Sequence, residues 1–153
     1  MSLASLLVRD RVLPVRKIEE ALQTQVVAGG DLGTILLEMD AIAENVLASY
    51  LAAVTHFLPA ARSEVMSPSK SALGFLTASD AERLRLLPIA IERGTMIFAG
   101  LAPVPTAVEE FLKDRSGFEV TVRIACEARL SAGLFKHYGV PLSARRRTEA
   151  VGR

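Results

Sequence analysis

A repeat with an offset of 29 residues runs through the first part of the chain, and it limits the possible folds more than any other feature. The apolar pattern of residues 3–8 returns in residues 32–37. Four later pairs keep the same offset: Leu13 with Ile42, Ile18 with Leu47, Ala21 with Tyr50, and Leu22 with Leu51. In each copy the apolar spacing predicts a short helix, a tight turn and a longer helix. Because a pair of helices cannot bury its own apolar face alone, we expect the two copies to stack as a four-helix unit over residues 1–59.

Turn and capping residues mark the ends of these helices. Pro14 suits the start of the second helix, where its missing N–H needs no partner. Gly29-Gly30 is expected to end that helix, and Asp31 is expected to cap the next one. Pro59 ends the fourth helix, because proline cannot continue the helical hydrogen bonds.

The second half of the chain alternates apolar and polar residues with a period of two, which is typical of strands. Leu87 to Ile91 and Thr95 to Ala99 flank the turn at Arg93-Gly94, so they predict a hairpin. Phe118 to Ile124 predicts a third strand with one buried face. Helical spacing predicts three further helices, within residues 77–86, 103–116 and 127–138.

These elements predict an α+β fold, in which a four-helix unit of two helical-hairpin repeats precedes a small sheet with helices packed on one face. The serine-rich residues 60–76 are expected to form a linker, with Val65-Met66 as a short edge strand. The small α/β domain is expected to span residues 77–140. The Arg-rich residues 141–153 lack apolar periodicity and are expected to form a disordered tail.

The overall composition excludes several classes of function. Lys and Arg number 18 and Asp and Glu number 17, so the net charge is +1 and gives no general preference for nucleic acid or an anionic membrane. The absence of Trp argues against a platform for stacking bases. A single cysteine, no signal-peptide pattern and no apolar run long enough to span a bilayer predict a cytoplasmic protein without direct membrane insertion.

The residue types that carry catalysis or bind cofactors are sparse. His56, Cys126 and His137 do not form a recognisable zinc-binding set. The segment from Gly29 to Gly33 lacks the lysine that a phosphate loop needs to reach the phosphates of a nucleotide. We therefore predict no catalytic residue, no metal site and no cofactor, and an enzyme of another type is the least supported alternative.

Two blocks of the sequence resemble a known family. In the first half the second repeat carries the motif residues Leu32-Gly33, Ile35-Leu36-Leu37, Leu47 and Leu51. In the second half the motifs are Leu87-Pro88-Ile89, Arg93-Gly94, Gly117 to Val122 and Tyr138-Gly139. Together they resemble the N-terminal region of type II secretion and type IV pilus assembly ATPases, a repeated helical module followed by an α/β domain.

This resemblance implies a non-catalytic regulatory or protein-docking module. In the family the N-terminal region contacts the cytoplasmic part of an inner-membrane secretion component, so such a protein is the expected partner. The alternative is a sensor of cyclic di-GMP, because the repeated module binds this nucleotide in some relatives. The resemblance then implies four ligand-binding residues: Gln25, Leu32, Gly33 and Leu36.

The sequence departs from the nucleotide-binding pattern at several positions. Ser2 and Asp31 stand where the pattern has arginine. An aspartate is unfavourable beside a dianionic ligand, because like charges repel. The other departures are Ala4 for the first glycine, Arg11 and Asp40 for later glycines, and Val54 for the second glutamine. Docking is therefore favoured over nucleotide binding.

Overall fold

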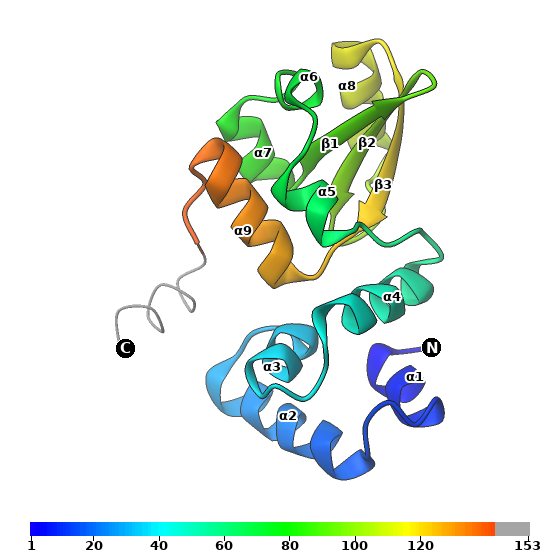
Figure 1. Ribbon diagram of the computed structural model, residues 1–153, viewed down its shortest axis with the longest axis vertical. Helices are drawn as coiled ribbons and strands as arrows, with labels where there is room; N and C mark the ends of the chain where they lie inside the picture. Colours follow the sequence, from blue (N-terminus) through cyan, green and yellow to red (C-terminus); the bar gives the residue numbers. More distant parts are fainter. Residues whose placement is uncertain (143–153) are drawn as a thin grey trace.

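The computed structural model describes residues 1–142 and confirms the α+β class. Figure 1 shows a helical unit, α1 to α4, at one end of the molecule and a sheet with its helices at the other. From residue 143 onward, the predicted disordered tail lies outside the described residues.

The 29-residue repeat is confirmed in the backbone. α1 (Leu3–Arg9) and α2 (Val15–Ala28) form the first copy, and α3 (Leu32–Glu38) and α4 (Glu44–Thr55) form the second. Each helix of the second copy begins 29 residues after its counterpart. α2 packs against α3, and α1 packs against α4, so each short helix contacts the long helix of the other copy.

The turn inside each copy also has the same geometry. The backbone N–H of Val12 donates to a carbonyl of α1 at 2.9 Å, and the equivalent N–H of Ala41 donates to a carbonyl of α3 at 2.9 Å. The residues just before them, Arg11 and Asp40, have left-handed φ values of 58° and 55°. A side chain in this conformation costs about 1 kcal/mol, which explains why the family pattern has glycine at these two positions.

The helical unit has its own apolar core. Leu7 and Leu36, which are equivalent in the two copies, are fully buried in it. The other buried residues of this core are Leu13, Ile18, Ala21, Ile35, Ile42, Leu47 and Cys126. Cys126 comes from the second half of the chain and directly precedes α9 (Glu127–Tyr138). The start of α9 therefore completes the core of the helical unit.

Residues 60–76 hold two short helices, α5 (Arg62–Met66) and α6 (Lys70–Leu73). Val65 and Ala72 are fully buried in the core around the sheet. This segment therefore contributes core residues, although its serine-rich composition suggests a linker.

The predicted short strand at Val65-Met66 is wrong. The backbone N–H of Ala61 donates to the Glu64 carboxylate at 2.9 Å, which is the capping interaction of a helix start. The local sequence therefore favours the first turn of α5 over an extended segment.

α7 (Ala78–Leu84) leads into a three-stranded sheet. β1 (Leu87–Glu92) and β2 (Thr95–Gly100) form the predicted antiparallel hairpin, and β3 (Glu119–Ile124) pairs parallel to β2. α8 (Thr106–Ser116) makes the crossover between β2 and β3. The strand order is β1-β2-β3.

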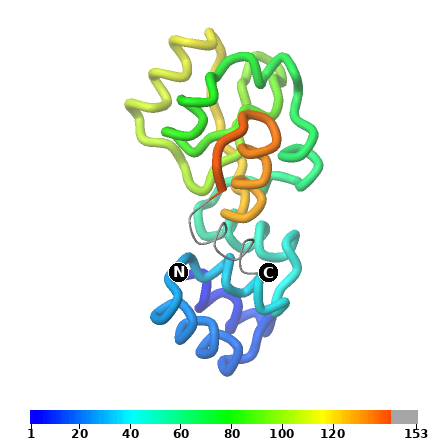
Figure 2. Tube along the Cα trace, turned by 90° about the vertical axis from the view of Figure 1, so that its left-hand side faces the viewer, coloured from blue at the N-terminus to red at the C-terminus, as the bar shows by residue number. Residues whose placement is uncertain are grey.

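Helices cover both faces of this sheet, which corrects the expectation of one covered face. Met96 to Ala99 in β2 are buried at four successive positions, and successive side chains of a strand point to opposite faces. Figure 2 accordingly shows α8 on one side of the strands and α5 on the other. The unbroken apolar run in the middle strand is the sequence feature that indicates two covered faces.

No helix within residues 1–142 combines the length and the apolar character that crossing a bilayer requires.

Candidate functional site

The helical unit contains two equivalent helix starts, at the positions where the family's nucleotide-binding pattern has arginine. The Ser2 hydroxyl accepts a hydrogen bond from the Ser5 N–H at 3.2 Å and caps α1. The Asp31 carboxylate caps α3, accepting from the Thr34 N–H at 3.0 Å and from the Thr34 hydroxyl at 2.5 Å. Asp31 therefore has a structural role in holding the start of α3, and it brings a negative charge to that position.

Three of the four predicted ligand residues meet at the junction between α2 and α3. The Gln25 side-chain amide donates to the Gly30 carbonyl at 3.0 Å and closes the connecting loop. Leu32 is half-buried and Gly33 is buried at the start of α3. A Cβ at position 33 would lie 3.3 Å from the Leu47 side chain, so glycine allows α3 to lie close to α4.

The fourth predicted residue, Leu36, lies inside the helical unit. Its side chain is fully buried in the core of that unit. Leu36 therefore lies beneath the surface, whereas Gln25 and Leu32 are partly exposed. The ligand-binding role of all four residues stays a prediction.

An apolar surface lies between α1 and α2, and we call it the α1–α2 face. Ala4, Val8, Val15 and Ile18 line it, and the exposed Leu22, four residues after Ile18 on α2, extends it by helix spacing. Two shallow depressions of about 430 and 360 Å³ adjoin at Val8. Arg9 lines the first and Arg11 lines the second, so the apolar surface has basic side chains at its edge.

This face could not be predicted from the sequence. Leu22 and its repeat equivalent Leu51 occupy the same position in the apolar pattern, so the pattern gives no sign that only one of them is exposed. In the structure Leu22 is 42% exposed, whereas Leu51 is partly buried against both cores. The difference depends on what covers each copy, and that is a property of the tertiary structure.

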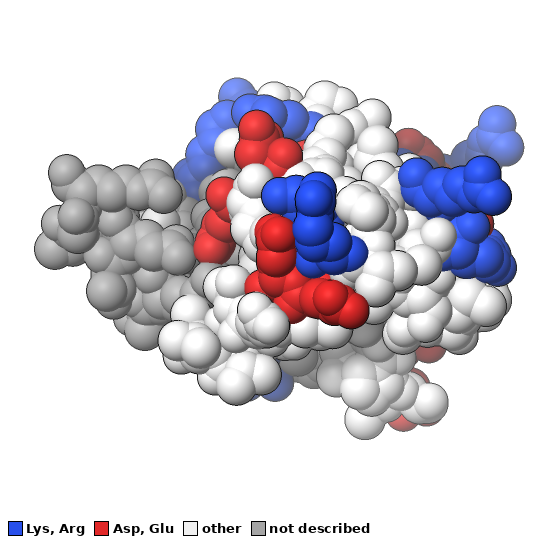
Figure 3. Space-filling view, turned by 90° about the horizontal axis from the view of Figure 1, so that it is seen from below, with Lys and Arg blue, Asp and Glu red and all other residues white. Residues whose placement is uncertain are grey.

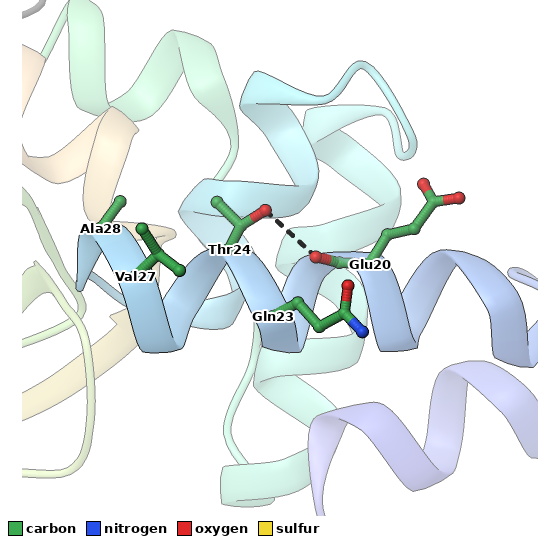
Figure 4. Close-up of a pocket in the computed structure, with 5 residues that line it drawn as sticks. All are labelled: Glu20, Gln23, Thr24, Val27 and Ala28. Carbon is green, nitrogen blue, oxygen red and sulfur yellow. Dashed lines mark hydrogen bonds between the residues drawn. The ribbon is translucent and has the colours of Figure 1, made fainter.

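The opposite side of α2 carries another shallow depression, of about 440 Å³. Figure 4 shows that all five of its lining side chains come from this one helix. The hydrogen bond drawn there joins the Thr24 hydroxyl to the Glu20 carbonyl at 3.1 Å. Val27, at the end of this surface, is 89% exposed. With polar groups that do not converge on one point, the depression has the character of an open protein surface.

A partly buried ion pair connects the two units. Arg129 of α9 donates to the Glu44 carboxylate of α4 at 2.8 and 2.5 Å, and the two side chains are 15% and 27% exposed. The hydrogen bond from Arg129 holds the pKa of Glu44 below its ordinary value. Beside this pair Cys126 is buried, and burial raises the pKa of its thiol. The partners are 85 residues apart in the chain, so no local pattern predicts their contact.

The two histidines have structural positions in different units. His56 ends α4 in a left-handed conformation with φ of 62°. A ring nitrogen of His137 lies 3.1 Å from the carbonyl oxygen of Met66. Among residues 1–142, His, Cys, Asp and Glu side chains form no group of three or more that could hold a metal ion.

Comparison with known proteins places this fold among secretion and pilus proteins. The sequence matches the MshEN domain family over residues 56–144, more than half of the chain. A solved structure of MshE with cdg (cyclic di-GMP) is 26% identical with a TM-score of 0.64, and the match covers 90% of this chain and 99% of that chain. A structure of the N-terminal domain of XpsE is 14% identical with a TM-score of 0.49, covering 88% and 92% of the two chains. No curated protein sequence matches the chain.

The family match lies in the sheet-containing half, and the match to MshE extends over 90% of the chain. These findings confirm the resemblance to the N-terminal region of type II secretion and type IV pilus assembly ATPases, and the chain belongs to the MshEN domain family.

Proposed function

We propose that the chain is a non-catalytic docking and regulatory module of a type II secretion or type IV pilus assembly system. It acts in the cytoplasm, and its partner is the cytoplasmic part of an inner-membrane component of that system. The observation that carries this proposal is a set of large apolar side chains exposed along α2. These are Val15, Leu22, Val26 and Val27, with exposed fractions of 53%, 42%, 86% and 89%.

Such a surface favours protein contact on physical grounds. Apolar side chains exposed together on a folded surface mark interaction sites more often than singly scattered ones do. Carboxylates elsewhere in the chain have structural partners: Glu44 pairs with Arg129, Glu64 with Arg123, and Asp80 with Arg83. This use of charged residues supports a docking role over catalysis.

A titration of the full chain with the purified cytoplasmic domain of the inner-membrane component tests the proposal. We expect saturable binding with a Kd of about 1–10 μM, typical of a modest interface in a regulated assembly. Val26→Asp is expected to weaken binding about tenfold, because it places a charge in a desolvated apolar contact. Phe135→Asp, on the exposed side of α9, is the matched control and should leave the affinity unchanged. Absence of binding at high micromolar concentration would contradict the proposed function.

A second candidate function is sensing of cyclic di-GMP. The observation that favours it is the match to MshE with cdg, which covers 90% of this chain and so includes the repeated helices. On this proposal Gln25, Leu32 and Gly33 contact the nucleotide at the α2–α3 junction, and Leu36 supports them. The carboxylate of Asp31 opposes it, because it places a negative charge where a dianionic ligand would lie.

Isothermal titration calorimetry with cyclic di-GMP tests this second function. If it holds, Asp31→Asn should raise the affinity about tenfold, because asparagine keeps the helix cap and removes the negative charge. Asp40→Asn makes the same charge change at the other end of α3, where asparagine also tolerates a positive φ, so it should have little effect. A flat titration for both the native chain and Asp31→Asn discards the sensor function.

A further inference from the structure

One copy of the helical repeat has a helix docked on it. The first turn of α9 lies against α3, and Figure 1 shows this end of α9 directed toward the helical unit. Cys126 and Ala128, two small residues at this end of α9, pack on the core of the helical unit. Arg129 completes the contact through its two hydrogen bonds to Glu44. The α3–α4 side of the repeat is therefore a helix-docking surface that is already filled.

The equivalent surface of the first copy is the α1–α2 face. The residue equivalent to Glu44 in the first copy is Val15, which is 53% exposed and lines one of the two depressions there. Leu22, the equivalent of Leu51, is likewise exposed. The helices of the two copies begin at equivalent positions, and only the second copy has α9 packed on it.

The charges at the edges of the two surfaces are opposite. The second copy has Glu38, Asp40 and Glu44 along its edge, and the helix docked there carries Arg129. At the equivalent positions the first copy has Arg9, Arg11 and the uncharged Val15. Val15, the counterpart of Glu44, lines the same depression as Arg11. A helix that docks on the first copy is therefore complementary when it has an acidic side chain where α9 has Arg129.

The basic residues of the α1–α2 face differ in how far they are engaged. Arg9 pairs with Asp10 at 2.9 Å, and Asp10 also accepts from the Tyr50 hydroxyl at 2.8 Å. Within residues 1–142, Arg11 makes no ion pair. Glu19 and Glu20 of α2 are both exposed. In Figure 3 basic side chains lie at the right-hand edge, in the middle and at the upper left, and acidic ones lie in the middle and on the left.

We propose that the α1–α2 face docks an amphipathic helix of a partner protein, with small apolar residues toward Val8 and Ile18 and an acidic side chain toward Arg11. The partner helix lies on α1 and α2 as α9 lies on α3 and α4. This inference rests on the proposed docking function and specifies its surface and the chemistry of the partner.

The docked α9 supplies a probe for this surface. The probe is a stapled helical peptide with the sequence of residues 126–139 and the change Arg129→Glu, and its reference is the same peptide with Arg129 kept. The staple lies on the solvent side, because a short free helix is marginally stable in water. In fluorescence anisotropy with the full chain, the Arg129→Glu peptide is expected to bind about tenfold more tightly than the reference.

Variants of the full chain locate the binding. Leu22→Asp should abolish binding of the Arg129→Glu peptide, and Arg11→Glu should weaken it about tenfold and favour the reference peptide instead. Gln23→Asp, at an exposed residue of the other depression on α2, is the matched control and should change nothing. Circular dichroism and thermal unfolding check that each variant is folded, which the exposure of Leu22 and Arg11 favours.

Equal affinity for the two peptides, or binding that survives Leu22→Asp, overturns the inference. The partner-domain titration separates this from the proposed function. A partner domain that binds but is unaffected by Leu22→Asp and Arg11→Glu upholds docking and excludes this face. If the peptide binds selectively but the partner domain does not bind, the α1–α2 face remains the docking surface and that domain is excluded as its partner.

Discussion

Gly133→Val is expected to lower the free energy of unfolding by about 3 kcal/mol, because α9 has no room for a side chain at this position. A Cβ at residue 133 would lie 2.7 Å from a methyl group of Val65 and 2.9 Å from one of Leu87. It would also lie 3.2 Å from the Val65 carbonyl oxygen, which cannot move without shifting the backbone of α5. The close approach of α9 to α5 and β1 therefore depends on a hydrogen in place of a side chain.

Urea unfolding at neutral pH measures this effect, and Gly74→Val is its matched control. A Cβ at residue 74 would have its nearest neighbour at 3.6 Å, which is an ordinary contact distance. Gly74 is also exposed, so its replacement should change the free energy of unfolding by less than about 0.5 kcal/mol. Similar losses for the two variants would show that helix packing at Gly133 is looser than the structure indicates.

The repeat and the strands were predictable because their patterns are local. Helix spacing, the cap at Asp31 and the turn at Arg93-Gly94 each involve residues that are neighbours in the chain. The same local rules predict a linker at residues 60–76. Serine and proline there suggest exposed turns, yet the segment holds two short helices, and Ala60, Val65, Ala72 and Leu76 are buried in the core around the sheet.

The candidate site was less predictable, for a reason that the two copies of the repeat make plain. Leu22 and Leu51 have the same sequence spacing but different exposure, because α9 lies beside one copy and not the other. A single repeat pattern thus specifies a partly buried position in one copy and an exposed position in the other. Sequence spacing identifies which residues face outward from a helix pair, but the rest of the chain decides which outward face stays open.

The contact that fills the second copy is also expected to hold the two units together, and Arg129→Met tests this. Removing one partner of a fully buried pair costs about 3–5 kcal/mol, and an exposed pair is worth about 0–1 kcal/mol. The Arg129–Glu44 pair lies between these limits, with side chains 15% and 27% exposed, so we expect a loss of about 2 kcal/mol. In a double-mutant cycle with Glu44→Gln, the coupling energy between the two residues should account for most of this loss.

The Lys113–Glu109 pair on α8 is the control for that cycle. Both of its side chains are more than a third exposed, at 38% and 39%, and the residues are four apart on one helix. Its coupling energy should be several-fold smaller than that of Arg129–Glu44, because solvent screens an exposed pair. A coupling as small as this at Arg129–Glu44 would mean that apolar packing around Cys126 holds the units together without help from the ion pair.

The pH dependence of the unfolding free energy further distinguishes a contribution of the ion pair from one of apolar packing. Because Arg129 lowers the pKa of Glu44 in the folded chain, the pair contributes its full stability above the unfolded-state pKa of glutamate, about 4.3. That contribution falls as the pH drops through the lower, folded-state pKa. The difference in unfolding free energy between the native chain and Arg129→Met should therefore be large at pH 7 and should shrink toward pH 2. A difference that stays constant over this range would assign the effect of Arg129 to its apolar stem packing on α4, and the charge of Glu44 would then have no part in joining the two units.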